Sequence, residues 1–460
     1  MRVRGPVALA VVLVGISTSG WARAAAEGSC QYIAVVDPCT QGLLILGTGG
    51  TEVLHRVVLS GGSLDLSHPT GVSFTTVPDG EEYAFVTHGP YLHVIDIRTS
   101  NPERTIPVSG LLFGSAELVV QRLEASGPVT VGAEARYPLY VIGDRLGEPW
   151  LLIFDQEQLL DEPFSWDGAL LAAGPLCDDG VSCYGVGLDI AVGGPPAGGG
   201  LQEAFASVFN ISSSNVLRFY RIVIHEDFSH DAFLDSWNDE GVSFGGVAQR
   251  INGLDYDATG TLPFGVFQTT SVVKNLSDGG SACTVSGHPT DVKVWGPGLD
   301  LEHPNFLFVS SASPDGSASL LGYPVGQCPD GTAATLELPV VGVPRALAVS
   351  SDTNETPWIY ATNQEESILA AHVQLSHEAG TGDRIDLLGW FEIQVENGCP
   401  NDVAIRDESR PSCYHLDGDL IEGGSGSKPP SVDCLTYPDD PRCLDSPKPV
   451  HVSAPGEEVP

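Results

Sequence analysis

The segment His68–Ile97 reads HPTGVSFTTVPDGEEYAFVTHGPYLHVIDI, and its pattern decides the fold. A turn at Pro69 introduces a short apolar strand, and the turn PDG at 78–80 leads to a second strand, Tyr83–Thr87. A third strand, Leu92–Ile97, follows closely. The second and third strands are apolar on both faces instead of alternating, which indicates strands sandwiched between two other layers.

Copies of the first strand recur at irregular intervals along the chain. Six copies begin at His68, Gly187, Asn252, His288, Val343 and Cys399, and a weaker seventh lies at Glu117–Leu123. Because one such sheet cannot cover both of its own faces, the repeated units must stack on one another. Four-stranded sheets stacked around an axis form a propeller. We therefore expect an all-β chain folded as a single β-propeller with seven blades of four strands.

Strands at the two ends of the chain complete the expected ring. Tyr32–Val36, Leu43–Leu46 and Val53–Leu59 lack a first strand of their own, and the copy that begins at Cys399 has little room for a full sheet. We expect these strands to form one blade shared by both ends, because such a blade closes the ring and removes its free edge. The propeller is thus predicted at residues 27–422.

The N-terminal residues predict export. Arg2 and Arg4, the apolar run Val7–Ile16 and the small residues of Ala22–Ala26 follow the order of a signal peptide, which we expect to span residues 1–26. No later stretch is long and apolar enough for a transmembrane segment, so none is expected. A periplasmic, cell-surface or extracellular location follows. Residues 423–460 are rich in Gly, Ser, Pro and Asp and are predicted to form a largely disordered tail.

The chain has ten cysteines, all beyond the expected signal peptide. An even number in an exported protein favours disulfide bonds, although spacing does not fix their connectivity. The spacing favours local pairs: Cys30–Cys39, Cys177–Cys183, Cys399–Cys413 and Cys434–Cys443.

The formal net charge is −38. A surface this acidic repels phosphates, so a nucleic-acid partner is excluded and cations are favoured. The alternative is that the acidic bias serves only solubility or salt tolerance.

Two stretches resemble known secreted repeats. Tyr360-Ala361-Thr362-Asn363 is similar to the tetrapeptide that names the YVTN-type β-propeller repeat, which the segment from His68 to Ile97 also resembles. Val94-Ile95-Asp96, followed by Ser100-Asn101-Pro102, is similar to the related LVIVD surface-protein repeat. The resemblance implies a propeller in an extracellular or periplasmic setting. It implies no single activity, because such propellers include surface proteins, ligand binders, lactonases and lyases.

One position of the first strand is repeatedly acidic. Asp189, Asp255, Asp291 and Asp402 occupy it in four copies, with Glu117 in a fifth and Gly71 and Ala346 in the other two. Innermost strands line a propeller's channel, so these carboxylates would face a common axis and could hold a hard cation such as Ca²⁺. The alternative is structural: each Asp accepts backbone amides and fixes the turn of its own blade.

His68 and His288 share the position before the turn proline. They are the candidates for a general base or for ligands at the mouth of the channel, and the alternative is an ordinary His-Pro turn. No nucleophile elbow, zinc-protease motif, phosphate loop or dinucleotide fingerprint occurs in the sequence. This absence favours a binding module without enzymatic activity, whose loops contact a protein or a surface polymer. The alternative is a lactonase-like hydrolase or lyase that holds a divalent cation in its channel.

Overall fold

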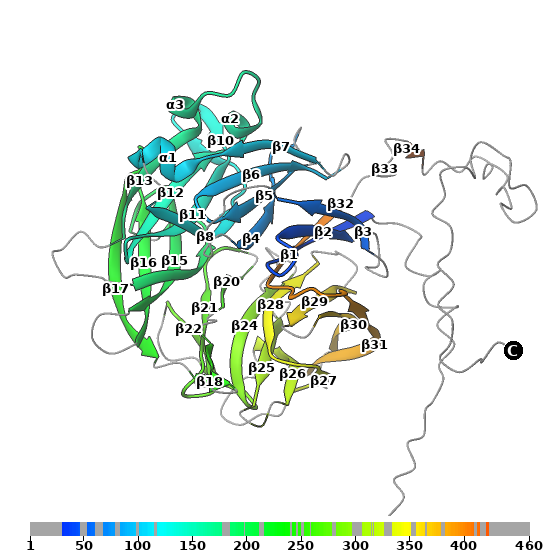
Figure 1. Cartoon of the computed structure of the whole chain (residues 1–460). Coiled ribbons are helices and arrows are strands. Elements are labelled where there is room, and N and C mark those ends of the chain that lie inside the picture. The colour runs from blue at the N-terminus through cyan, green and yellow to red at the C-terminus, as the bar shows by residue number, and fades with distance from the viewer. Residues whose placement is uncertain are drawn as a thin grey trace, which may run out of the picture.

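The computed structural model describes residues 30–46, 53–59, 68–78, 83–97, 101–114, 117–176, 185–196, 198–210, 216–239, 242–244, 247–249, 253–257, 259–277, 282–296, 306–313, 315, 317–325, 334–350, 356–363, 366–378, 382–408, 412–414 and 420–422. This part of the chain forms seven four-stranded antiparallel sheets around a common axis (Figure 1). The predicted seven-bladed β-propeller is therefore confirmed.

The blades are numbered here in chain order, and their strands are given from the axis outward. Blade 1 is β4 (Pro69–Phe74), β5 (Tyr83–His88), β6 (Tyr91–Asp96) and β7 (Asn101–Ile106); blade 2 is β8 (Leu118–Ala125), β11 (Pro138–Arg145), β12 (Glu148–Asp155) and β13 (Leu170–Pro175). Blade 3 is β14 (Gly185–Val192), β15 (Gln202–Asn210), β16 (Val216–Ile224) and β17 (His230–Asp239); blade 4 is β20 (Leu254–Tyr256), β21 (Pro263–Phe267), β22 (Val272–Asn275) and β23 (Ala282–Thr284). Blade 5 is β24 (His288–Trp295), β25 (Phe306–Ala312), β26 (Ala318–Pro324) and β27 (Leu336–Val340); blade 6 is β28 (Pro344–Val349), β29 (Trp358–Asn363), β30 (Ser367–Glu378) and β31 (Gly382–Gln394). Blade 7 is β32 (Asp402–Glu408), β1 (Cys30–Asp37), β2 (Gly42–Leu46) and β3 (Val53–Val58).

Short elements lie between these strands and after the last of them, β32. The helices are α1 (Val108–Phe113), α2 (Gln156–Leu160) and α3 (Trp166–Ala169). Three hairpins are β9 (Val129–Val131) with β10 (Glu134–Arg136), β18 (Val242–Phe244) with β19 (Val247–Gln249), and β33 (Ser412–Tyr414) with β34 (Leu420–Glu422).

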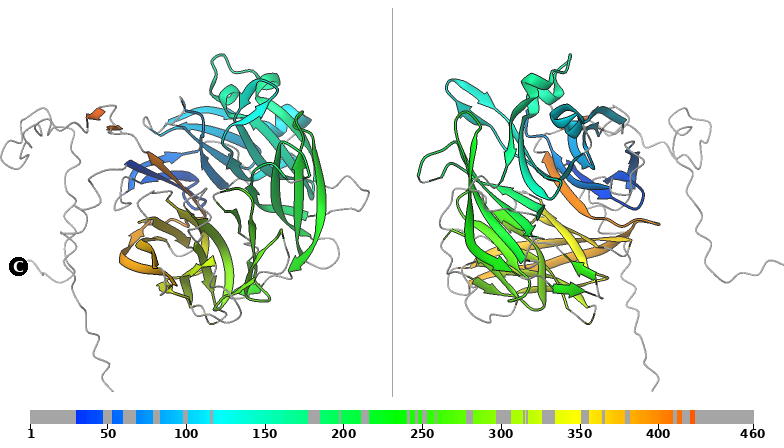
Figure 2. Two further views of the ribbon diagram at one scale, coloured as in Figure 1. Left: turned by 180° about the vertical axis from the view of Figure 1, so that it is seen from behind. Right: turned by 60° about the vertical axis from the view of Figure 1, so that its left-hand side comes forward.

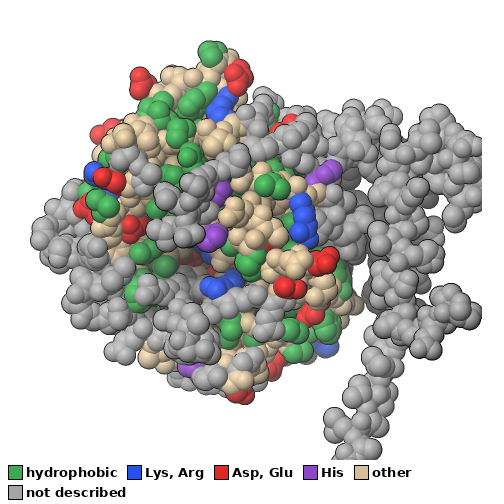
Figure 3. Space-filling view, in the orientation of Figure 1, with side chains coloured by type: hydrophobic (Ala, Val, Ile, Leu, Met, Phe, Trp, Pro, Cys, Tyr) green, Lys and Arg blue, Asp and Glu red, His purple; other side chains and the backbone are tan. Residues whose placement is uncertain are grey.

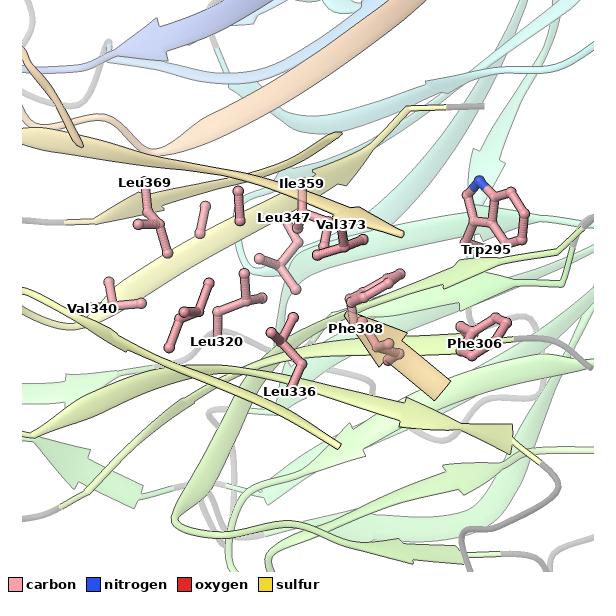
Figure 4. Packing of buried hydrophobic residues seen from close by; sticks show 14 of the residues in the cluster. Trp295, Phe306, Phe308, Leu320, Leu336, Val340, Leu347, Ile359, Leu369 and Val373 are labelled. Carbon is pink, nitrogen blue, oxygen red and sulfur yellow. The ribbon is translucent and has the colours of Figure 1, made fainter. Parts of the chain in front are cut away.

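The hydrophobic core lies between the blades. Within the described part of the chain, most buried apolar residues fall into seven clusters, and each cluster joins two neighbouring blades. Between blades 5 and 6, for example, Phe308 and Leu320 face Ile359 and Leu369 (Figure 4). Strands that are apolar on both faces therefore take part in two clusters at once, as the sequence pattern predicts.

Blade 7 closes the ring with both ends of the chain. Strand β32 pairs antiparallel with β1, with Ile405 opposite Ile33, and lies beside the blue N-terminal strands in Figures 1 and 2. This confirms the predicted shared blade. The blade is also linked covalently, because Cys39 forms a disulfide with Cys399 across a sequence separation of 360 residues.

The predicted local pairs Cys30–Cys39 and Cys399–Cys413 are therefore wrong. Spacing along the chain favours short loops, but closure of the ring brings distant residues together at one blade. The buried Asp37 fixes the junction, because its Oδ1 accepts the backbone amides of Cys39 (3.1 Å) and Cys399 (2.9 Å). Cys177–Cys183 and Cys434–Cys443, the expected signal peptide and the tail at 423–460 lie outside the described residues.

Candidate functional site

The candidate site is a cavity of about 550 Å³ on the propeller axis, lined by residues from all seven inner strands. These strands, β4, β8, β14, β20, β24, β28 and β32, lie beside one another in a closed circle. The face seen in Figure 3 is hollowed near its centre, where blue Lys or Arg atoms are visible. We call this cavity the channel.

The channel side chains of the inner strands lie at two levels, and a bulge marks the first level in several blades, whereas the inner strands of blades 4 and 7 pair without a register shift. In blades 1, 2, 3 and 5 the register shifts by one residue, and the residue after the shift begins the level that we call the first. The second level lies two residues further along each strand, on the same side of the strand. In blade order, the residues at the first level are Gly71, Arg122, Asp189, Gly253, Asp291, Ala346 and Asp402. The residues at the second level are Ser73, Glu124, Ala191, Asp255, Lys293, Ala348 and Ala404.

Three of the four predicted aspartates, Asp189, Asp291 and Asp402, occupy the first level as expected. Asp255 lies one level deeper, and Gly253 takes the first-level position in blade 4. In blade 2 the equivalent residue is Arg122, and Glu117 precedes β8, where it contacts Arg145 at 3.3 Å on the outside of the molecule. In blade 4 the inner strand pairs without a register shift, so the offset of two residues comes from the alignment of short sequence motifs, which does not fix the register, and not from a bulge.

Each acidic side chain of the channel binds the next blade. At the first level, Asp189 Oδ2 accepts the amide of Leu254 at 2.9 Å, Asp291 Oδ2 that of Leu347 at 2.7 Å, and Asp402 Oδ2 that of Val72 at 3.0 Å. At the second level, Asp255 Oδ2 accepts the amide of Val294 at 2.7 Å, Glu124 accepts that of Val192, and Ser73 Oγ accepts that of Ala125 at 3.2 Å. Six of the seven blade junctions thus carry a hydrogen bond of this kind, which we call an inter-blade latch.

The latches have a simple physical cause. Each inner strand is the edge strand of its sheet, so the amides on its axial side have no strand partner. A buried amide without an acceptor costs free energy comparable to a lost hydrogen bond. A carboxylate from the preceding blade supplies that acceptor, and charge strengthens the bond. The aspartates therefore bind the neighbouring blade, and Asp291 and Asp255 also accept an amide of their own strand, the kind of contact that the structural alternative from the sequence describes.

Gly253 shows how closely the first-level residues approach. A Cβ atom on Gly253 would lie 1.7 Å from Asp291 Oδ1 and 2.6 Å from Asp291 Cα. Blade 4 therefore needs glycine at the first level, because Asp291 of blade 5 occupies the space of any side chain there.

Two cations pair with the carboxylates. Arg122 lies 2.6 Å from Asp402 Oδ1, and Lys293 lies 3.6 Å from Asp255 Oδ1. Burial lowers the pKa of Lys293, but Asp255 and Asp291 outweigh that effect and raise it above its ordinary value. Neither cation was predicted as a site residue. The signal was the alternation Arg122-Leu123-Glu124 and Asp291-Val292-Lys293, in which charged residues two apart share one side of a strand.

Burial also shifts the acids. It raises the pKa of Glu124 to about 8, because the cationic Lys293 only partly offsets the desolvation of the carboxylate. It raises the pKa values of Asp189, Asp255 and Asp291 as well. Arg345, which lines the channel from β28, has its pKa lowered to about 10 by burial and by Arg122.

The carboxylates do not converge on one point. Among the described residues, the only group with three potential ligand atoms within 4.8 Å of one another is Asp37, Cys39 and Cys399, where both sulfurs form the disulfide. A Ca²⁺ ion held by Asp189, Asp255, Asp291 and Asp402 together would thus require their side chains to move. The calcium-dependent hydrolase stays a prediction.

His68 and His288 do not line the channel. His68 is exposed before β4, and His288 at the start of β24 hydrogen-bonds through Nδ1 to the carbonyl oxygen of Gln268 at 2.7 Å. They occupy equivalent positions in blades 1 and 5. The structure does not bring them together with the channel carboxylates, and their proposed role as a base or ligand stays a prediction.

No family model and no curated protein matches this sequence. Solved structures with similar architecture include apo AztD from Citrobacter koseri, which is 10% identical in sequence. The match covers 82% of this chain and 98% of that chain, with a TM-score of 0.42. The dihydro-heme d1 dehydrogenase NirN in complex with DHE is 12% identical, and its match covers 81% of this chain and 74% of that chain with a TM-score of 0.41. Hsv2 from Kluyveromyces lactis is 11% identical, and its match covers 79% of this chain and 96% of that chain with a TM-score of 0.41. Likeness at this level carries no inference about function.

No helix within the described ranges has the length and apolar character needed to cross a lipid bilayer.

Proposed function

We propose that this chain is an exported, non-enzymatic binding module that contacts a protein or a surface polymer with the outer part of its propeller. The observation that carries the proposal is an exposed apolar patch on β31, the outermost strand of blade 6. Leu387, Leu388 and Trp390 are 39%, 36% and 47% exposed there. We call these three residues the β31 patch.

The β31 patch has the chemistry of a contact surface. Aromatic residues with a large accessible area contribute strongly to binding, and exposed apolar side chains gathered at one place often mark interaction sites. Strand β31 spans Gly382–Gln394, and within the described part of the chain its sheet ends there. A partner could therefore contact both its side chains and its outer backbone edge.

The channel supports the same proposal. Its carboxylates serve as inter-blade latches, and Arg122 and Lys293 pair with two of them. This arrangement favours a rigid scaffold over an acid-base pair. The Cys39–Cys399 disulfide is compatible with export. Membership of the YVTN-type repeat family is likewise part of the proposal.

The experiment compares three proteins on arrays of immobilised polysaccharides and peptides. They are the wild type, the double variant Leu387→Ser with Trp390→Ser, and the control Val58→Ser, which removes an apolar side chain that is 72% exposed on blade 7. We expect the double variant to bind at least about tenfold more weakly to whichever probe the wild type retains, and the control to bind normally. Equal binding by all three proteins contradicts the proposal, and so does turnover of esters or lactones by the wild type.

A further inference from the structure

The disulfide that closes the ring lies beside a buried carboxylate. Asp37, the last residue of β1, is fully buried, whereas Cys39 is exposed and Cys399 is half-buried. The two sulfurs and a carboxylate oxygen of Asp37 lie within 4.8 Å of one another. Cysteine thiolates and carboxylates are ligands that Zn²⁺ takes in tetrahedral sites. In the oxidised protein the sulfurs are bonded to each other, so only reduction makes this donor set complete.

Hydrogen bonds hold the two cysteines in place independently of the disulfide. Asp37 Oδ1 accepts the backbone amides of Cys39 at 3.1 Å and of Cys399 at 2.9 Å. Close by, the amide of Asn401 donates to the carbonyl oxygen of Val36 at 2.9 Å, and strands β1 and β32 pair along their length. These contacts do not involve sulfur, so the two thiols of the reduced protein should stay side by side.

Asp37 has a free position for a cation. Its Oδ1 accepts a third amide, that of Thr40 at 3.5 Å, whereas within the described residues its Oδ2 accepts one bond, from the hydroxyl of Thr40 at 2.7 Å. Each carboxylate oxygen offers about two acceptor positions, so Oδ2 retains one. Two thiolates beside this carboxylate would place three negative charges together, and a divalent cation relieves their repulsion.

We propose that Cys39, Cys399 and Asp37 form a redox-gated site for a divalent ion of the zinc class, which binds once the disulfide is reduced. A dithiol breaks the sulfur–sulfur bond by supplying two electrons and two protons, and is itself oxidised to a disulfide. The ion then displaces the two thiol protons into solvent and binds the thiolates and Asp37, with water as a fourth ligand. The bound ion joins the two ends of blade 7 in place of the disulfide.

The site needs little movement of the backbone. Two thiolates on one tetrahedral zinc ion lie about 3.8 Å apart, because each Zn–S distance is about 2.3 Å. The Cα atoms of Cys39 and Cys399 are 5.4 Å apart, so rotation of the side chains is enough to separate the sulfurs by that distance. The exposure of Cys39 gives the reductant and the ion access. This proposal goes beyond the binding module and does not depend on the β31 patch.

Calorimetric titration of the full chain with Zn²⁺, in the absence of oxygen, tests this site. The disulfides are reduced with a phosphine, which becomes its oxide and adds no competing thiol. The wild type is compared with the double variant Cys39→Ser with Cys399→Ser, which retains the other eight of the ten cysteines. We expect the reduced wild type to bind one more Zn²⁺ per chain than the reduced double variant, and the oxidised wild type to lack this ion.

Two further measurements connect the ion to Asp37 and to ring closure. Asp37→Asn should weaken the additional Zn²⁺ at least about tenfold, whereas the exposed control Glu226→Gln should bind it normally. In limited proteolysis of the reduced wild type, Zn²⁺ should slow release of the N-terminal strands of blade 7, and it should have no such effect on the double variant.

Three results would overturn the proposal. The first is equal Zn²⁺ binding by the reduced wild type and the reduced double variant, and the second is binding by the oxidised wild type as tight as that by the reduced protein. The third is release of the N-terminal strands from the reduced wild type at the same rate with and without Zn²⁺. This last measurement uses the unaltered chain, so it decides even if a variant fails to fold.

Discussion

The carboxylate of Asp291 joins two blades, because its Oδ1 accepts the amide of Val292 in its own strand at 2.8 Å and its Oδ2 accepts the amide of Leu347 in blade 6 at 2.7 Å. Asp291 is only 5% exposed, so water does not readily replace either bond. The same relation recurs around the axis with other residues, and it makes the latches a property of the ring and not of a single blade.

Removal of this latch should destabilise the fold. Asp291→Ala leaves the Leu347 amide buried without its acceptor, which we expect to cost about 2–4 kcal/mol in the free energy of unfolding. Asp291→Asn retains an acceptor oxygen and should cost about 1 kcal/mol or less at pH 7. Urea unfolding of both variants, beside the exposed control Glu226→Ala, measures the difference. Equal stability of Asp291→Ala and the wild type contradicts the role of the latch.

Gly253 should not tolerate a side chain. In Gly253→Ala the new Cβ meets both the carboxylate and the backbone of Asp291, so we expect a loss of about 2–4 kcal/mol. Gly389→Ala is the matched control, because a Cβ at that strand position meets no atom within 4 Å. Urea midpoints of the two variants are the measurement. If Gly253→Ala proves as stable as Gly389→Ala, the close approach of blades 4 and 5 is wrong.

The ring closure should depend on the disulfide. Replacement of Cys39 and Cys399 by alanine is expected to cost about 3–5 kcal/mol, because the bond closes a very long loop in the unfolded chain. Limited proteolysis should then release the N-terminal strands of blade 7 sooner than in the wild type. Mass spectrometry of non-reduced peptides provides the direct check, and a Cys30–Cys39 or Cys399–Cys413 peptide pair would refute the observed connectivity.

Stability should fall as the pH rises. Glu124 has a pKa near 4.3 in an unfolded chain and of about 8 when buried in the channel, so the folded state holds this proton more tightly. Its contribution is fully present below about pH 4 and is lost as the pH rises through about 8. Asp189 and Asp291, whose pKa values are also raised by burial, act in the same direction.

The measurement is the urea midpoint between pH 5 and 8.5. We expect Glu124→Gln to remove about 1–3 kcal/mol of the decline, because glutamine carries no proton to lose, whereas the exposed Glu226→Gln should leave the decline intact. A wild type that grows more stable over this interval disagrees with the burial of these acids.

Most of the fold is predictable from the sequence because its cause is local and repeated. Strands such as Tyr83–His88 are apolar on both faces, and this alone requires neighbouring sheets. The shared blade 7 follows from counting strands that lack partners. The partners of Cys39 and Cys399 are not predictable from spacing, because the pairing depends on how the ring closes in space.

The site is less predictable than the fold. The acidic positions are visible in the sequence, but their level in the channel depends on the register of each inner strand, which short motifs do not fix, and Asp255 is therefore misassigned by two residues. The roles of Arg122 and Lys293 are not predictable from the sequence, because they depend on carboxylates that other blades bring beside them. Whether an aspartate binds a metal or an amide depends on the distances between blades, which no single repeat contains.

Amide hydrogen exchange tests the latches most directly. In the wild type, the amides of Val72, Leu254, Val294 and Leu347 should be protected, and a chelator should not change their exchange rates. In Asp291→Ala, the amide of Leu347 should exchange at least about a hundredfold faster while that of Leu254 keeps its protection. Unaltered protection of Leu347 in this variant, or protection of all four amides that vanishes when divalent cations are removed, would contradict the account.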